Sequence, residues 1–155
     1  MASTPRILIA LLTDRQDYQH HQEAEARAAA AEAGFEVEVI YAENSPVVQA
    51  QRLHARVAVS AEKRPAAIVV ELAAGAGFER VARAAVEAGI GWVVISARVP
   101  HLEALQRQHP ASLICCVVTD DEEIGRIQAS PDLLTYSESE LSGLRVTRAP
   151  GRPSA

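Results

Sequence analysis

The sequence predicts an α/β protein, a three-layer α/β/α sandwich built on one parallel sheet. Three observations support this prediction. Five short apolar runs rich in β-branched residues alternate with helical patterns along the 155 residues. Two of the helical patterns stop at Gly34 and Gly89. Strands that alternate with helices imply right-handed crossovers and a parallel sheet covered on both faces, and 48% hydrophobic residues suffice for one core.

The strands are expected in the apolar runs 6–12, 35–41, 66–72, 92–96 and 113–119. Most of these runs are continuously apolar, which is typical of strands buried on both faces. The run 35–41 instead alternates glutamate with apolar residues. This alternation places it nearer an edge of the sheet, with one face partly in contact with water.

The helices are expected at 24–33, 46–62, 78–88, 102–108 and 120–128. Pro46 suits the first turn of the second helix, after a cap at Asn44 or Ser45. The last helix would begin with acidic residues, where the helix dipole favours them.

One domain is expected over residues 1–129, followed by a divergent helix or tail over 130–155. Leu133 and Leu134 suggest a further helix, but Ser, Pro, Gly and Arg dominate after Ser137, and 147–155 is expected to be disordered. The apolar run after Arg6 is too short for a signal peptide and lacks a cleavage site. The chain as written is therefore expected in the cytoplasm, and a periplasmic location would follow if a leader had been removed.

Composition argues against several classes of partner. The net charge of −5 gives no general attraction to nucleic acid or to an anionic membrane, and no apolar run is long enough to span a bilayer. Cys115 and Cys116 are adjacent within a strand, so they would point to opposite faces as buried free thiols. Their spacing fits neither a zinc site nor a redox pair.

No catalytic, cofactor or metal motif is identified. Gly75-Ala-Gly77 lacks the third glycine of a dinucleotide fingerprint and follows the wrong strand, and there is no phosphate-binding loop. His20 and His21 would point about 100° apart on a helix, which favours a solvated helix start over a metal pair. We therefore expect no catalysis, cofactor or metal, although an unrecognised α/β enzyme stays as an alternative.

Polar side chains gather where the predicted strands end, which is the usual ligand edge of an open parallel sheet. Carboxylates and a guanidinium beside an aromatic ring suit a polyhydroxylated ligand, because they bond hydroxyl groups while the ring covers an apolar sugar face. Helix capping is an equally good explanation for Asp14, Asn44 and Asp120. The candidate ligand-binding residues are Asp14, Asp17, Tyr18, Asn44, Glu71, Arg98 and Asp120.

An ordered series of short motifs resembles the N-terminal lobe of type I sugar-binding periplasmic proteins and LacI-like regulators. The series comprises Asp17-Tyr18-Gln19, then Ala42-Glu43-Asn44 with Gln49 and Gln51, then the stretch 88–94, and finally Asp120 followed by Glu-Ile-Gly-Arg-Ile-Gln at 123–128. The likeness covers about residues 6–128.

The resemblance implies a flavodoxin-like strand order of 2-1-3-4-5 and a receptor without catalysis. In that family two lobes close on a sugar for ABC import, chemotaxis or transcriptional control. The resemblance implies that five side chains face the ligand, those of Asp14, Asp17, Tyr18, Arg98 and Asp120. A LacI-type DNA-binding headpiece is absent from this sequence.

The likeness stops after Gln128, whereas a full receptor is about twice as long and has a second lobe. We therefore expect a half-size or truncated solute-binding protein that binds a small polar solute weakly, as a homodimer, or with a complementary lobe. The alternative is a self-associating flavodoxin-like domain without a ligand.

Overall fold

The computed structural model of the chain describes residues 4–120 together with 125 and 126. The helix expected at 120–128 and the tail expected at 130–155 fall almost wholly outside these residues. The chain divides into two compact units, Met1–Val118 and Thr119–Ala155, and the elements below belong to the first. In chain order they are β1 (Arg6–Leu11), α1 (Asp17–Glu32), β2 (Glu36–Tyr41), α2 (Pro46–Val57), η1 (Ala61–Lys63), β3 (Ala67–Glu71), α3 (Glu79–Glu87), β4 (Gly91–Ile95), α4 (His101–Gln108) and β5 (Ile114–Val117).

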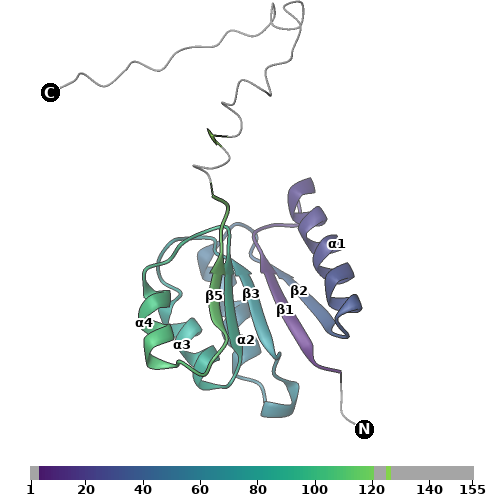
Figure 1. The fold of residues 1–155 in the computed structure, drawn as a ribbon. Coiled ribbons are helices and arrows are strands. Elements are labelled where there is room, and N and C mark those ends of the chain that lie inside the picture. The colour runs from purple at the N-terminus through teal and green to yellow at the C-terminus, as the bar shows by residue number, and fades with distance from the viewer. Residues whose placement is uncertain (1–3, 121–124, 127–155) are drawn as a thin grey trace, which may run out of the picture. The chain divides into compact units, whose positions relative to one another are not determined.

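The five strands form one parallel sheet in the order β2-β1-β3-β4-β5, which confirms the expected class and order. Helix α1 lies on one face, while α2, α3 and α4 lie on the other (Figure 1). The second face holds the main core, where buried strand residues such as Leu8, Ile68 and Trp92 meet Leu53 and Phe78 from the helical layer. Among the described residues, no helix is long and apolar enough to cross a membrane.

Two helices end as their glycines predict. Gly34 and Gly89 have φ angles of +76° and +79°, the left-handed conformation that glycine adopts without a steric cost. The N–H of Phe35 donates to the carbonyl of Ala30 at 2.8 Å, and Ile90 donates to Ala85 at 2.9 Å. These are Schellman bonds, which satisfy carbonyls in the last helical turn and direct the chain into β2 and β4.

Helix α1 begins at Asp17, seven residues before the predicted start at residue 24. The N–H groups of Gln19 and His20 both donate to the Gln16 carbonyl, which closes the first turn. The apolar periodicity did not extend to this turn because its buried side chain, Gln19, is polar. Asp17 and Tyr18 therefore stand on a helix and not in a loop.

Helix α2 is shorter than predicted. It ends at Val57, and a separate 3₁₀ turn, η1, replaces its expected last turn. Its start follows one of the two expected caps, because the Ser45 hydroxyl accepts a hydrogen bond from the N–H of Val48. Asn44 does not cap this helix.

The two cysteines are free, as expected, but both are half-buried and not buried. The reason is their place on β5, the edge strand, which has a neighbour only on its β4 side. Cys116 packs against the main core, and Cys115 pairs with Val93 across the sheet. Strand β2 forms the other edge, in agreement with its alternating pattern.

Candidate functional site

The carboxyl ends of the parallel strands bring together the loops that follow them. Asp14 follows β1, Asn44 follows β2, Glu71 ends β3 and Arg98 follows β4. The first two and Arg98 are exposed, whereas Glu71 is half-buried. The first unit thus places four of the seven predicted residues along one edge, which we call the carboxyl edge.

The loop after β1 is held by three hydrogen bonds. The Leu12 N–H donates to Oε1 of Gln19 at 2.8 Å, and the Leu12 carbonyl accepts from the N–H of Asn44 at the same distance. The hydroxyl of buried Thr13 accepts from the N–H of Arg15 at 3.2 Å. Asp14 is exposed on this fixed backbone and does not cap α1, whose cap position is Gln16.

Two buried amides, Gln19 and Gln49, fix the end of β3. Each is 1% exposed. Nε2 of Gln19 donates to Oε2 of Glu71 at 2.6 Å. Nε2 of Gln49 donates to the Glu71 carbonyl at 2.7 Å, and its Oε1 accepts from the N–H of Ala73 at 2.9 Å. The two glutamines therefore join α1 and α2 to the third strand end.

Glu71 is positioned by this arrangement. Its Oε2 accepts a hydrogen bond from the Gln19 amide. A carboxylate held in this way presents an acceptor at the carboxyl edge at little entropic cost, since its rotamer is already fixed. Both glutamines stand in the motifs that carry the family resemblance, but the sequence alone assigned them no structural role.

Backbone strain is concentrated along the carboxyl edge. The described residues other than glycine with positive φ are Glu43 and Asn44 at +55° and Ser96 at +67°. The first two follow β2, and Ser96 follows β4, where its N–H donates to the Val117 carbonyl at 2.9 Å. Non-glycine residues in this region cost about 1 kcal/mol or more, and such strain clusters at binding sites. Ser96 is a position that sequence reasoning did not include.

Tyr18 lies beside an apolar hollow on the α1 side of the sheet. The hollow measures about 390 Å³, and its floor includes Ile9, Val69 and Ile95. Tyr18 is 60% exposed, and its hydroxyl accepts from Nε2 of Gln22 at 3.0 Å. The ring therefore offers an apolar surface next to the first turn of α1.

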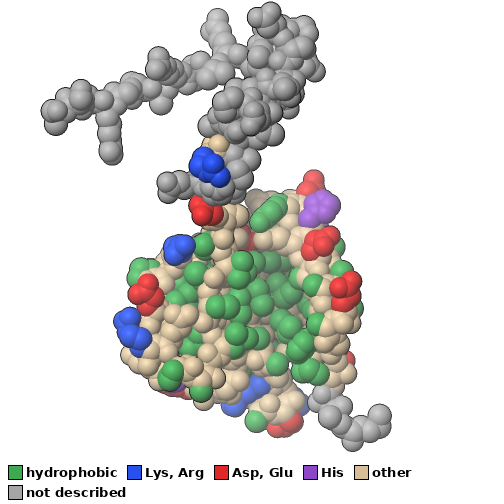
Figure 2. All heavy atoms as spheres, in the orientation of Figure 1, with side chains coloured by type: hydrophobic (Ala, Val, Ile, Leu, Met, Phe, Trp, Pro, Cys, Tyr) green, Lys and Arg blue, Asp and Glu red, His purple; other side chains and the backbone are tan. Residues whose placement is uncertain are grey.

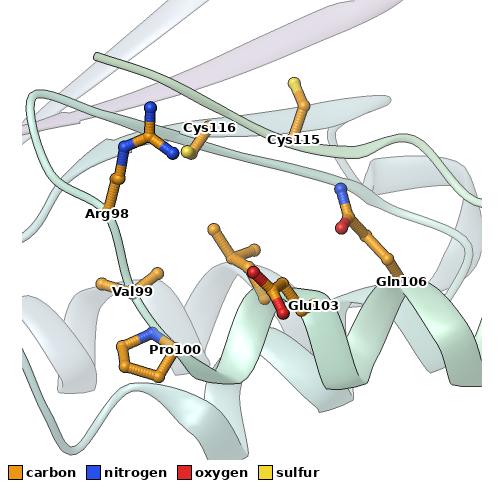
Figure 3. Close-up of a pocket in the computed structure, with 8 residues that line it drawn as sticks. Arg98, Val99, Pro100, Glu103, Gln106, Cys115 and Cys116 are labelled. Carbon is orange, nitrogen blue, oxygen red and sulfur yellow. The ribbon is translucent and has the colours of Figure 1, made fainter. Parts of the chain in front are cut away.

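Arg98 lines a different hollow, of about 590 Å³, between α4 and β5. Figure 3 shows Arg98, Glu103 and Cys116 around this space. Gln106 closes part of the strand edge there, because its Nε2 donates to the Ile114 carbonyl at 2.7 Å. The structure thus brings Arg98 and Tyr18 to separate hollows, neither of which is lined by Asp14, Asn44 or Glu71.

Asp120 belongs to the second unit, so no arrangement of it against the first unit is described. His20 and His21 are exposed on α1. Within the described part of the chain, no group of three His, Cys, Asp or Glu side chains could hold a metal ion.

An ionisable pair joins α1 to the end of β2. The Tyr41 hydroxyl donates to Oε2 of Glu23, whose Oε1 accepts from Arg27. Burial, followed by the Glu23 carboxylate, raises the pKa of Tyr41 to about 12. The hydrogen bonds from Tyr41 and then Arg27 lower the pKa of Glu23. This pair fixes α1 against the second strand just below the carboxyl edge.

Comparison with protein-family models and with curated protein sequences gave no match. Solved structures do match. A periplasmic solute-binding protein of an ABC transporter from Actinobacillus succinogenes, with bound D-allose, has a TM-score of 0.65 and 20% identity over 81% of this chain and 42% of its own. A periplasmic ribose ABC transporter protein from Conexibacter woesei has a TM-score of 0.65 and 19% identity over 83% and 39%.

A third structure, an ABC transporter solute-binding protein from Bacillus halodurans with bound myo-inositol, has a TM-score of 0.53 and 16% identity, covering 64% of this chain and 33% of its own. The chain has the fold of one lobe of a type I periplasmic binding protein. This lobe spans about two fifths of the length of the first two structures. All three neighbours are named for solute binding or transport.

Proposed function

We propose that this lobe binds a sugar or a similar small polar solute at its carboxyl edge and catalyses no reaction. The observation that carries the proposal is the fixed position of Glu71, which two buried glutamines hold at the end of β3. Asp14 and Asn44 stand at neighbouring strand ends of the sheet, on loops joined by backbone hydrogen bonds. The structural neighbours support the class of ligand, since they are named for allose, ribose and myo-inositol.

The chemistry of these groups fits a polyol. Carboxylates accept hydrogen bonds from sugar hydroxyls, and the amide of Asn44 both donates and accepts. The remaining predicted residues, Asp17, Tyr18, Arg98 and Asp120, are kept as proposed contributors. Arg98 and Tyr18 would contribute only to a ligand that extends towards the hollows they line.

One lobe supplies half of such a site, so we expect weak binding. About three to five hydrogen bonds contribute roughly 1 kcal/mol each, and association costs several kcal/mol. A dissociation constant of about 1 mM or weaker follows. A second copy or a separate lobe set against the carboxyl edge would complete the site and raise the affinity.

The proposed role is solute capture for import or sensing. Two of the neighbours are named as periplasmic proteins, and the periplasm would suit this role. The cytoplasmic location expected from the sequence stays a prediction.

The test is a titration of the ¹⁵N-labelled chain with D-ribose, D-allose and myo-inositol, followed by amide chemical shifts. We expect saturable shifts in the loops after β1, β2 and β3. Glu71→Gln should weaken binding by about tenfold, because a charge-assisted hydrogen bond contributes about 1.5 kcal/mol. Asp14→Ala should act in the same direction.

Glu36→Gln is the matched control, since Glu36 is an exposed carboxylate at the opposite end of β2. It should leave the titration unchanged. Shifts that do not saturate, or that are equal in Glu71→Gln and the parent chain, would contradict binding at this edge.

The alternative function is self-association without a ligand. A specific observation favours keeping it: the α1 side of the sheet carries an exposed apolar surface, with Leu113 and Val117 58% and 60% exposed.

A further inference from the structure

The α1 side of the sheet carries an apolar surface over β3, β4 and β5. The strand register places Val69, Val93 and Cys115 in one row, and Ile95 and Val117 in the next. Leu113 extends the surface along β5, where its side chain lies against the position of Gly91. Figure 2 shows apolar side chains gathered on the face beside α1. We call these six residues (Val69, Val93, Ile95, Leu113, Cys115 and Val117) the sheet patch.

The two faces of the same strands differ sharply in burial. Ile68, Trp92 and Val94 face the helical layer and are fully buried. Their neighbours Val69, Val93, Ile95 and Cys115 in the sheet patch are half-buried, whereas Leu113, just before β5, and Val117, at its end, are largely exposed. Parallel sheets are normally covered on both faces, so an apolar surface of this kind marks a site of protein contact.

Within the first unit, α1 is the described helix on this side, and it packs against β1 and β2. It borders the sheet patch without covering it. The part of the sheet that α1 leaves uncovered within the first unit is about 10 to 15 Å wide, since three strands lie about 4.8 Å apart. That width corresponds to one helix.

Helix α1 carries small residues on the outer side of its later turns. Ala24, Ala28 and Ala31 are exposed and follow one another at spacings of four and three residues, so they share one side of the helix. The buried residues of α1, Gln19 and Ala30, lie on the side that faces the sheet. A helix with small apolar residues on its outer side can approach a second apolar surface closely.

We propose that two copies of this chain pair through these surfaces, so that α1 of each copy lies over the sheet patch of the other. A two-fold axis parallel to the strands produces this pairing, because it places α1 of the second copy beside α1 of the first, over the first copy's sheet patch. The assembly stops at two chains, because each copy contributes both its sheet patch and its α1 to the pair. The proposal goes beyond the proposed function and does not depend on it. Both carboxyl edges would point the same way and stay open to solutes.

The size of the contact fits a reversible dimer. Helix α1 has 16 residues and is about 24 Å long. A strip of that length and about 10 Å wide, counted on both surfaces of two equivalent contacts, gives about 1,000 Å². This value lies at the low end of specific interfaces. We therefore expect a monomer–dimer equilibrium that shifts with concentration.

The test is sedimentation velocity of the whole chain over a hundredfold range of concentration, with two single variants. Val117→Lys puts a charge on the sheet patch, and Ala28→Glu puts one on the outer side of α1. Both positions are exposed, so the fold should survive, and circular dichroism checks that it does. Each variant alone should lower the dimer fraction at least tenfold. Val47→Lys, at a 65% exposed position on α2, is the matched control and should not change it.

Mixing the two variants sharpens the test. In the mixed dimer one contact is entirely unmodified, and the other sets the introduced glutamate against the introduced lysine, so dimer should reappear on mixing. A parent chain that is monomeric at every concentration would overturn the proposal. So would a dimer that neither variant weakens. If the parent chain is monomeric and Val117→Lys lowers its thermal stability, then another part of the same chain covers the sheet patch. This result also refutes the pairing.

Discussion

At the scale of single residues, two buried polar side chains join the helices to the ends of the strands. Gln19 and Gln49 are almost completely buried, yet neither interrupts the packing, because each amide meets both a donor and an acceptor. A buried amide costs stability only when its hydrogen bonds are missing. The two glutamines hydrogen-bond to the loops and strand end of the carboxyl edge, and these bonds explain why Glu71 has a fixed position.

Gln49→Ala should destabilise the lobe by about 2 to 3 kcal/mol, because it leaves the Glu71 carbonyl and the Ala73 N–H without partners. Gln51→Ala is the control, since Gln51 is exposed on the same helix. Urea denaturation followed by circular dichroism measures both. Equal midpoints for the two variants would show that the Gln49 amide does not hold this strand end.

Tyr41 should make the lobe sensitive to alkaline pH. Its pKa is about 12 in the folded chain and 10 ordinarily, so the unfolded chain loses this proton first. The resulting stability is complete below pH 10 and is lost as the pH rises from 10 towards about 12. The free energy of unfolding should fall by up to about 1.4 kcal/mol per pH unit within this window.

Tyr41→Phe removes that proton, and its unfolding free energy should depend less steeply on pH over the same range. The measurement is urea denaturation at a series of pH values for both chains. Parallel curves would contradict the raised pKa of Tyr41.

At the scale of elements, the predictions succeeded wherever a local rule decides the outcome. The strand positions were predicted within one or two residues at each end, since continuous β-branched runs are specific to buried parallel strands. The start of α1 was wrong because its first turn buries a glutamine, and the end of α2 was wrong because the chain forms a 3₁₀ turn there. Local patterns do not show which polar residue the tertiary structure will bury.

Gly89→Ala should cost about 1 kcal/mol, because an alanine at φ +79° is strained although no atom crowds its Cβ position. Gly75→Ala is the matched control, since Gly75 has equally open surroundings and does not have a positive φ. Thermal unfolding should therefore show a lower midpoint temperature for Gly89→Ala and an unchanged one for Gly75→Ala. A similar shift in both would mean that the left-handed end of α3 is not needed.

At the scale of the whole molecule, the amino-acid sequence determined the class of fold, the strand order through its family resemblance, and the edge where polar groups gather. The fold class and the polar edge follow from hydrophobic periodicity and from the geometry of parallel sheets, whereas the strand order is what the family resemblance implies. Only the tertiary structure decided that Tyr18 and Arg98 line separate hollows and that two glutamines hold Glu71. It also decided that Leu113 and Val117 of the sheet patch are exposed. The physical reason is that side-chain contacts across the sheet depend on register and on which helix covers which strand, and these are settled only when distant segments pack together.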